Sequence, residues 1–187
     1  MHTINIDENI LGSSFIDLFQ GSQYIKLSMS DYKEDGLSPY DYCSSETMIG
    51  QYSFLDFDVE KVAVKINQDK QLKEVMLKLK VWDGQHFYEK VTEKYGMPDT
   101  SSLSKYYIEK HGFEIPTTIK IDSVNNYYNN LPKPRIKDFP EVRSLSWYDV
   151  NNKSGKVLAD LVIKNKSNPS NKFQKQEIWV VFRRAKK

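Results

Sequence analysis

The residue types best suited to nucleophilic or metal chemistry are scarce in this chain. It has one cysteine, Cys43, and three histidines, of which His86 and His111 could each act as a base beside the thiol. The sequence around Cys43 shows no helix start or nucleophile elbow that would lower the thiol pKa. No H-x₃-H or C-x₂-C spacing occurs. We therefore predict no catalytic residue, no metal site and no cofactor.

Two carboxylates give the chain its best enzymatic alternative. Asp56 and Asp58 lie two residues apart in the segment YSFLDFDV, which is predicted to place them on one face of a strand. Such a pair could bind a divalent cation or divide acid and base roles. The alternative function is thus a small-molecule or metal-dependent enzyme. The glycine-rich nucleotide loops and the G-x-S-x-G elbow do not occur.

Basic residues supply a second alternative, a weak nucleic-acid-binding module. The C-terminal end carries a basic cluster next to Trp179, and a second basic cluster precedes the last three strands; the residues are Arg183, Arg184, Lys186, Lys187, Lys133, Arg135 and Lys137. The 27 basic and 25 acidic side chains nearly cancel, to a formal charge of +2. This balance makes nucleic acid an unlikely partner, because sequence-independent phosphate binding needs a strong positive field.

Aromatic residues are abundant, with 12 Tyr, 9 Phe and 3 Trp. Tyr and Trp in loops and at strand ends often dominate protein interfaces. We predict a non-catalytic protein-binding protein, inhibitor-like or immunity-like, which occludes an unidentified protein partner through aromatic loops and a sheet face. The candidate contact residues are Tyr40, Tyr42, Trp82, Tyr127, Tyr128 and Trp147.

An antiparallel sheet is the main element that must position these residues. Apolar residues alternate with lysine over 62–66 and 72–82, and a turn at Asn67 to Lys70 joins the two strands as a hairpin. The segment 52–58 is predicted as one further strand. Later strands are expected at 145–148, 157–163 and 177–182, so the three tryptophans lie on or near different strands.

Helices are expected at about 13–20, 84–95 and 102–110. The middle helix has the clearest limits: Asp83 can cap its start, and Gly96 and Pro98 end it. The region 30–50 carries turn residues and is predicted as a long loop containing Tyr40 and Tyr42.

These elements predict a single α+β domain over residues 1–187, an antiparallel meander with a few short helices on one face. Residues 1–82 and 83–187 could form two loosely similar helix-plus-sheet halves. A lone cysteine and the lack of an apolar run long enough to span a membrane favour the cytoplasm, although a trimmed secretion or lipoprotein signal would leave no trace. An exposed strand edge would allow a homodimer.

The segment HFYEKVTEKYGMPD, residues 86–99, resembles a pattern found in uncharacterised bacterial proteins. The pattern is an amphipathic helix ending in Tyr95-Gly96-Met97-Pro98, followed by strands of which the first carries a tryptophan, here Trp147. The early LGSSFIDLF resembles a looser copy of this unit. Two such units would be similar to the β-lactamase-inhibitor-like α+β architecture. This resemblance implies a non-catalytic protein that uses its exposed sheet face or loops to hold another protein.

Overall fold

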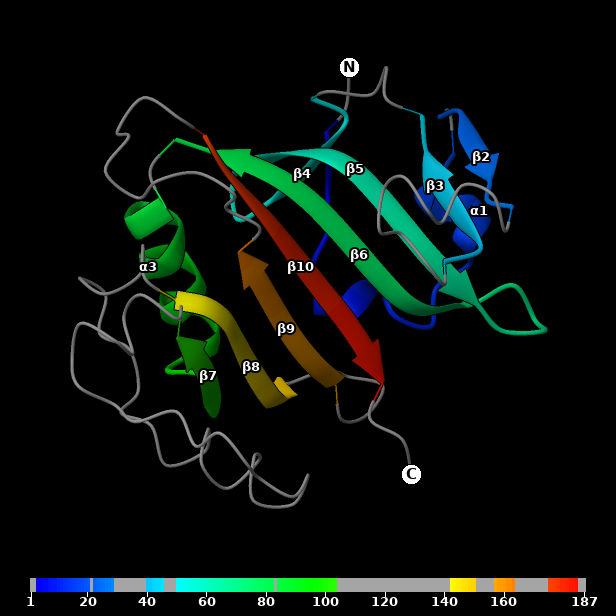
Figure 1. Cartoon of the computed structure of the whole chain (residues 1–187). Coiled ribbons are helices and arrows are strands. Elements are labelled where there is room, and N and C mark those ends of the chain that lie inside the picture. Colours follow the sequence, from blue (N-terminus) through cyan, green and yellow to red (C-terminus); the bar gives the residue numbers. More distant parts are fainter. Residues whose placement is uncertain are drawn as a thin grey trace.

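The structure is a computed structural model that describes residues 3–20, 22–28, 40–45, 50–82, 84–103, 142–150, 157–163 and 175–184. Within these ranges the chain forms one sheet of ten strands with short helices, mostly antiparallel, which confirms the predicted α+β class (Figure 1). No helix in the described ranges is long and apolar enough to cross a membrane.

The elements follow a simple order along the chain. The helical segments are the 3₁₀ helix η1 (Glu8–Ile10), α1 (Phe15–Leu18) and α3 (Gly84–Tyr95). The strands are β1 (Ile4–Asn5), β2 (Tyr24–Lys26), β3 (Tyr42–Ser44), β4 (Tyr52–Phe54), β5 (Phe57–Ile66), β6 (Leu72–Val81), β7 (Thr100–Leu103), β8 (Val142–Val150), β9 (Val157–Ile163) and β10 (Gln176–Arg184).

Two sets of antiparallel strands make up the sheet. Strands β2, β3, β5 and β6 pair in chain order, and so do β7, β8, β9 and β10. The last strands of the two sets, β6 and β10, pair antiparallel at the centre. β4 pairs antiparallel with β5, and β1 pairs with β4 in parallel. Because α1 precedes the first set and α3 the second, this order is the one that a repeated helix-then-meander unit would give; the resemblance itself stays a prediction.

One face of the sheet carries the main core. A cross-strand row on this face runs through Val64, Val75, Phe182, Ala159 and Trp147. All five are buried, together with Phe15 of α1 and Phe87 of α3, so both helices pack on this face. We call it the inner face and the opposite side the outer face. Burial of these side chains is the main force that holds the sheet against the helices.

The best local predictions are confirmed. The helix over 84–95 ends where expected, because Gly96 has φ of 75° and its N–H bonds the carbonyl of Thr92. The hairpin turn also forms: the N–H of Lys70 bonds the carbonyl of Asn67, and Lys70 has φ of 57°. Strand β9 coincides with the predicted strand 157–163.

Four predictions about elements are wrong in part. The segment 52–58 is not one strand, since Leu55 and Asp56 have φ of 51° and 69° and form a two-residue hairpin turn between β4 and β5. Ser102 does not begin a helix but lies in β7, and residues 104–110 lie outside the described ranges. The first helix shrinks to Phe15–Leu18. The expected long loop contains strand β3, because Tyr42 and Cys43 pair with β5.

Candidate binding face on the outer side of the sheet

The outer face carries an apolar row that crosses the sheet from its β2 edge to its centre. The register places five residues side by side on successive strands, namely Ile25, Cys43, Ala63, Met76 and Val181. The three middle members are buried and form a small apolar cluster with Tyr40, against which Trp179 and Val181 pack. The sheet therefore has a second apolar cluster on the side opposite its core.

A band of apolar and charged residues runs along the two central strands of this face. We call it the outer band: Met76, Lys78, Lys80 and Trp82 on the β6 side, and Lys175, Glu177, Trp179 and Val181 on the β10 side. The register sets Met76 opposite Val181, Lys78 opposite Trp179 and Lys80 opposite Glu177. Residues at every second position of a strand share a face, so the band follows from the pairing of β6 with β10.

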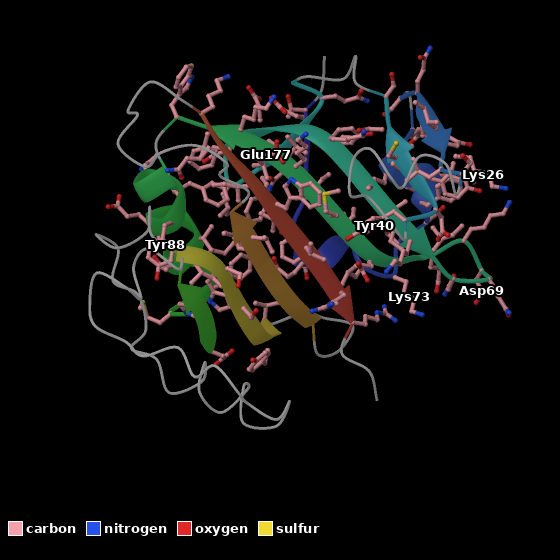
Figure 2. All side chains as sticks on the ribbon, in the orientation of Figure 1. Lys26, Tyr40, Asp69, Lys73, Tyr88 and Glu177 are labelled. Carbon is pink, nitrogen blue, oxygen red and sulfur yellow. The ribbon has the colours of Figure 1, made fainter. Side chains whose placement is uncertain are left out.

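Trp179 is held in place by its neighbours. Its indole N–H donates a hydrogen bond of 2.8 Å to Oε1 of Glu177, two positions back on the same strand. The other oxygen of Glu177 lies 3.4 Å from Nζ of Lys78. The tryptophan ring is half-buried and packs on the cluster of Met76 and Tyr40. Figure 2 shows Tyr40 and Glu177 over the central strands of the sheet.

The far end of the outer band is open to solvent. Trp82 directly follows β6 and is 65% exposed, and Nζ of Lys175 lies 5.1 Å from the centre of its ring, a cation–π contact. Lys80 pairs with Glu60 of β5 at 3.3 Å. Exposed ion pairs of this kind each contribute at most about 1 kcal/mol to stability. Their main effect is to orient the long side chains around the two tryptophans.

The predicted contact residues lie in different places. Trp82 is at the surface, whereas Tyr40 and Trp147 are only 6% and 4% exposed. Tyr42 is half-buried and stacks on Phe15 of α1 with ring centroids 4.9 Å apart. Tyr127 and Tyr128 lie outside the described residues. Of the four that the structure describes, Trp82 alone belongs to the outer band, and Tyr40 packs beneath it.

Sequence reasoning missed Trp179 as a contact residue. In the segment EIWVVF, Ile178, Val180 and Phe182 are buried in the core, so Trp179 and Val181 must face the other way. The alternation with Glu177 carried this signal. This signal is weak in the sequence, because both sides of the strand are apolar near Trp179.

The residues considered as catalytic alternatives lie at different places in the described structure. Asp56 lies in the β4–β5 turn and Asp58 in β5, and both are exposed. Cys43 is buried on the outer face, whereas His86 lies on α3, which packs on the inner face. His111 lies outside the described ranges. Among the residues that the structure describes, no group of three or more His, Cys, Asp and Glu side chains could hold a metal ion.

The basic cluster is only partly described. Arg183 and Arg184 are exposed at the end of β10, and Arg183 lies opposite Glu74 of β6. The other basic residues of the predicted patch, at 133, 135, 137, 186 and 187, lie outside the described ranges.

A buried polar network joins the N-terminal segment to the end of α3. The hydroxyl of Tyr95 donates a 2.6 Å hydrogen bond to Oε2 of the buried Glu8, and Nζ of Lys94 lies 3.3 Å from the same oxygen. Asn9 donates to the other carboxylate oxygen. Burial and the nearby Glu8 charge raise the pKa of Tyr95 far above its usual range. With both oxygens of Glu8 engaged, the network fastens η1 to the helix.

An open depression of about 350 Å³ lies where β2, β3 and the β5–β6 hairpin meet. Its lining is Lys26, Leu27, Asp41, Tyr42, Ile66, Asn67 and Gln68. The only carboxylate of this lining already accepts a 2.8 Å hydrogen bond from the backbone N–H of Ile66. The side chain of Asp41 therefore extends the strand pairing between this segment and β5.

The outer band thus brings aromatic and charged side chains together on the central strands and holds them by a hydrogen bond, two ion pairs and a cation–π contact. The chain matches no protein-family profile, no curated protein sequence and no solved structure, so its own geometry is the basis for assigning a function.

Proposed function

We propose that this chain is a non-catalytic protein-binding protein, inhibitor-like or immunity-like, which occludes a partner by holding it against the outer band. The observation that carries the proposal is the placement of Trp82 and Trp179 among lysines on the central strands of the sheet. Tryptophan is one of the residue types that are enriched at the energetic centres of protein interfaces.

Preorganisation supports this proposal. The Glu177 carboxylate fixes the indole of Trp179, and the Lys175 ammonium lies over the ring of Trp82. Side chains that are already ordered lose little entropy when a partner binds, so more of the contact energy contributes to affinity. An antiparallel sheet adds to this effect because its hydrogen bonds hold the backbone beneath the band.

The charge of the outer band indicates the kind of partner. Lys78 and Lys80 form ion pairs with Glu177 and Glu60, and Lys175 lies over the ring of Trp82, so the band and its ion-pair partners carry three lysines and two carboxylates. Complementary charge speeds association and disfavours wrong partners. We therefore propose a partner with an acidic surface that carries an apolar or aromatic centre.

The shape of the site also favours a macromolecule. Small-molecule sites are usually concave and enclose most of their ligand. The outer band instead spans the pairing of two long strands and presents side chains outward from a sheet face. A face of this kind can cover another protein's surface.

The test is an affinity capture from native lysate with matched variants. Trp82→Ala and Lys80→Glu change exposed members of the outer band, and Lys73→Glu makes the same charge change at an exposed position of β6 outside it. We expect one stoichiometric partner to be retained by the wild type and by Lys73→Glu but lost by the two band variants. Thermal unfolding of all four proteins controls for folding.

The proposal fails if the band variants keep the partner at wild-type yield, because the contact would then lie elsewhere. It also fails if Lys73→Glu loses the partner to the same degree as Lys80→Glu. That result would mean that overall charge, rather than the outer band, controls binding.

A further inference from the structure

Strand β2 forms one edge of the sheet, and its hydrogen bonds leave a defined set of backbone groups pointing outward. The N–H of Leu27 bonds the carbonyl of Asp41, and the N–H of Ser45 bonds the carbonyl of Gln23, both across to the β3 side. In an antiparallel ladder such bonds recur at every second residue, so Ile25 also faces β3. The N–H and C=O groups of Tyr24 and Lys26 therefore point away from the sheet.

This edge also carries exposed apolar side chains. Tyr24 and Ile25 are 46% and 52% exposed, and β3 is the one strand that pairs with β2 in the described part of the chain. Lys26 extends from the same edge (Figure 2). An exposed edge strand can serve as a template for pairing with another chain, and β2, with three residues and one lysine, offers two of its residues, Tyr24 and Lys26, for such hydrogen bonds.

We propose that a second copy of this chain pairs antiparallel with β2, about a twofold axis that passes beside Ile25. In this arrangement Tyr24 lies opposite Lys26 of the second copy, and Lys26 lies opposite Tyr24 of the second copy. Because Tyr24 and Lys26 have their backbone groups turned outward, both pairs are hydrogen-bonded pairs. The two copies then share one continuous sheet through a self-complementary interface.

The side chains fit a second copy on both faces of the sheet. On the inner face, the Tyr24 ring already packs against Phe15, Phe19 and Tyr42, with ring centroids 5.5 to 5.7 Å away. The ammonium of Lys26 from the second copy would meet this fixed ring, a cation–π pairing that occurs twice in the dimer.

On the outer face, the two Ile25 side chains meet at the twofold axis as a non-hydrogen-bonded pair, with Cα atoms about 4.5 Å apart. Ile25 is the edge member of the apolar row that leads through Cys43 and Ala63 to the sheet centre. Pairing would extend this row across both copies. The inference is independent of the proposed function, because the outer band lies on the central strands.

Disulfide crosslinking tests the register directly. In Ile25→Cys the two new thiols face each other across the axis at a separation that a disulfide can span, whereas in Lys26→Cys each thiol faces Tyr24 of the second copy. Both variants also carry Cys43→Ala, because Cys43 lies opposite Ile25 on β3 and could otherwise form an intramolecular disulfide with the new thiol. We expect a disulfide-linked dimer from Ile25→Cys on mild oxidation and little from Lys26→Cys. Equal crosslinking of the two variants would overturn the proposed register.

Sedimentation equilibrium tests the dimer itself. We expect the wild-type mass to rise with concentration from 21.9 kDa towards twice that value. Lys26→Pro removes an outward N–H that no bond to β3 uses, so this variant should stay monomeric with unchanged thermal stability. A wild-type mass that stays at 21.9 kDa at all concentrations would overturn the proposal, as would a Lys26→Pro variant that dimerises like the wild type.

Discussion

The hydroxyl of Tyr95 offers a sharp test of how the N-terminal segment is held. It donates its hydrogen bond to a buried carboxylate, Glu8, at 2.6 Å. Tyr95→Phe removes this bond but keeps the ring, which packs against Trp147 and Phe182 with centroids 6.2 and 6.3 Å away. The change therefore isolates the hydrogen bond from the packing of the ring.

The expected magnitude follows from the charge of the acceptor. A hydrogen bond to a charged group contributes about 1.5–3 kcal/mol, and a bond between neutral groups about 0.5–1.5 kcal/mol. We expect Tyr95→Phe to lower the free energy of unfolding by about 1.5–3 kcal/mol. In a Glu8→Gln background, where the acceptor is neutral, Tyr95→Phe should lower the free energy of unfolding by only about 0.5–1.5 kcal/mol.

Urea unfolding at neutral pH measures these differences. Tyr24→Phe is the matched control, because Tyr24 is 46% exposed and no hydrogen bond of its hydroxyl is seen within the described residues. Its cost should stay within about 0.5 kcal/mol. The reasoning would be refuted if Tyr95→Phe were as stable as Tyr24→Phe, or if it cost the same with Glu8 and with Gln at position 8.

Two further predictions concern pH and backbone conformation. Burial raises the pKa values of Tyr52 and Tyr95 in the folded state, so the stability they contribute is present below the unfolded value of about 10 and is lost as pH rises above it. Alkaline unfolding, followed by tyrosinate absorbance, should therefore be less steep in Tyr95→Phe than in the wild type. Gly12 and Gly50 have φ of 92° and 85°, and the Arg184 guanidinium occupies the space that a Cβ would need at Gly12 alone. Each change to Ala should cost about 1–2 kcal/mol from backbone strain. Thermal unfolding should show similar losses for the two variants, because the Arg184 guanidinium is the end of a flexible, exposed side chain that can move away from a new Cβ at position 12. A clearly larger loss for Gly12→Ala that Arg184→Ala removes would contradict this expectation.

The sequence predicted those elements whose signals are local. Lysine alternation identified the two strands of the β5–β6 hairpin, and Gly96 and Pro98 marked the end of α3. It failed at Leu55 and Asp56, because neither residue is the glycine or asparagine that usually signals a turn with positive φ. One continuous strand was therefore predicted where two strands meet.

The outer band could not be predicted in the same way. Nothing in the sequence indicates that β6 and β10 are neighbours, because about a hundred residues separate Trp82 from Trp179 and strand pairing over such distances leaves no local pattern. Tyr40 illustrates the same limit, since its residue type and flanking turn residues are typical of a loop although its ring is buried.

The sequence by itself determined the α+β class, the alternation that gives the sheet two different faces, and the limits of α3. Only the tertiary structure decided which strands lie side by side, which aromatic rings are buried, and that Trp82 and Trp179 share the outer face. The physical reason is that hydrogen-bonding geometry and side-chain periodicity act between near neighbours in sequence. The partner of each strand, in contrast, is selected by the burial of apolar area across the whole chain.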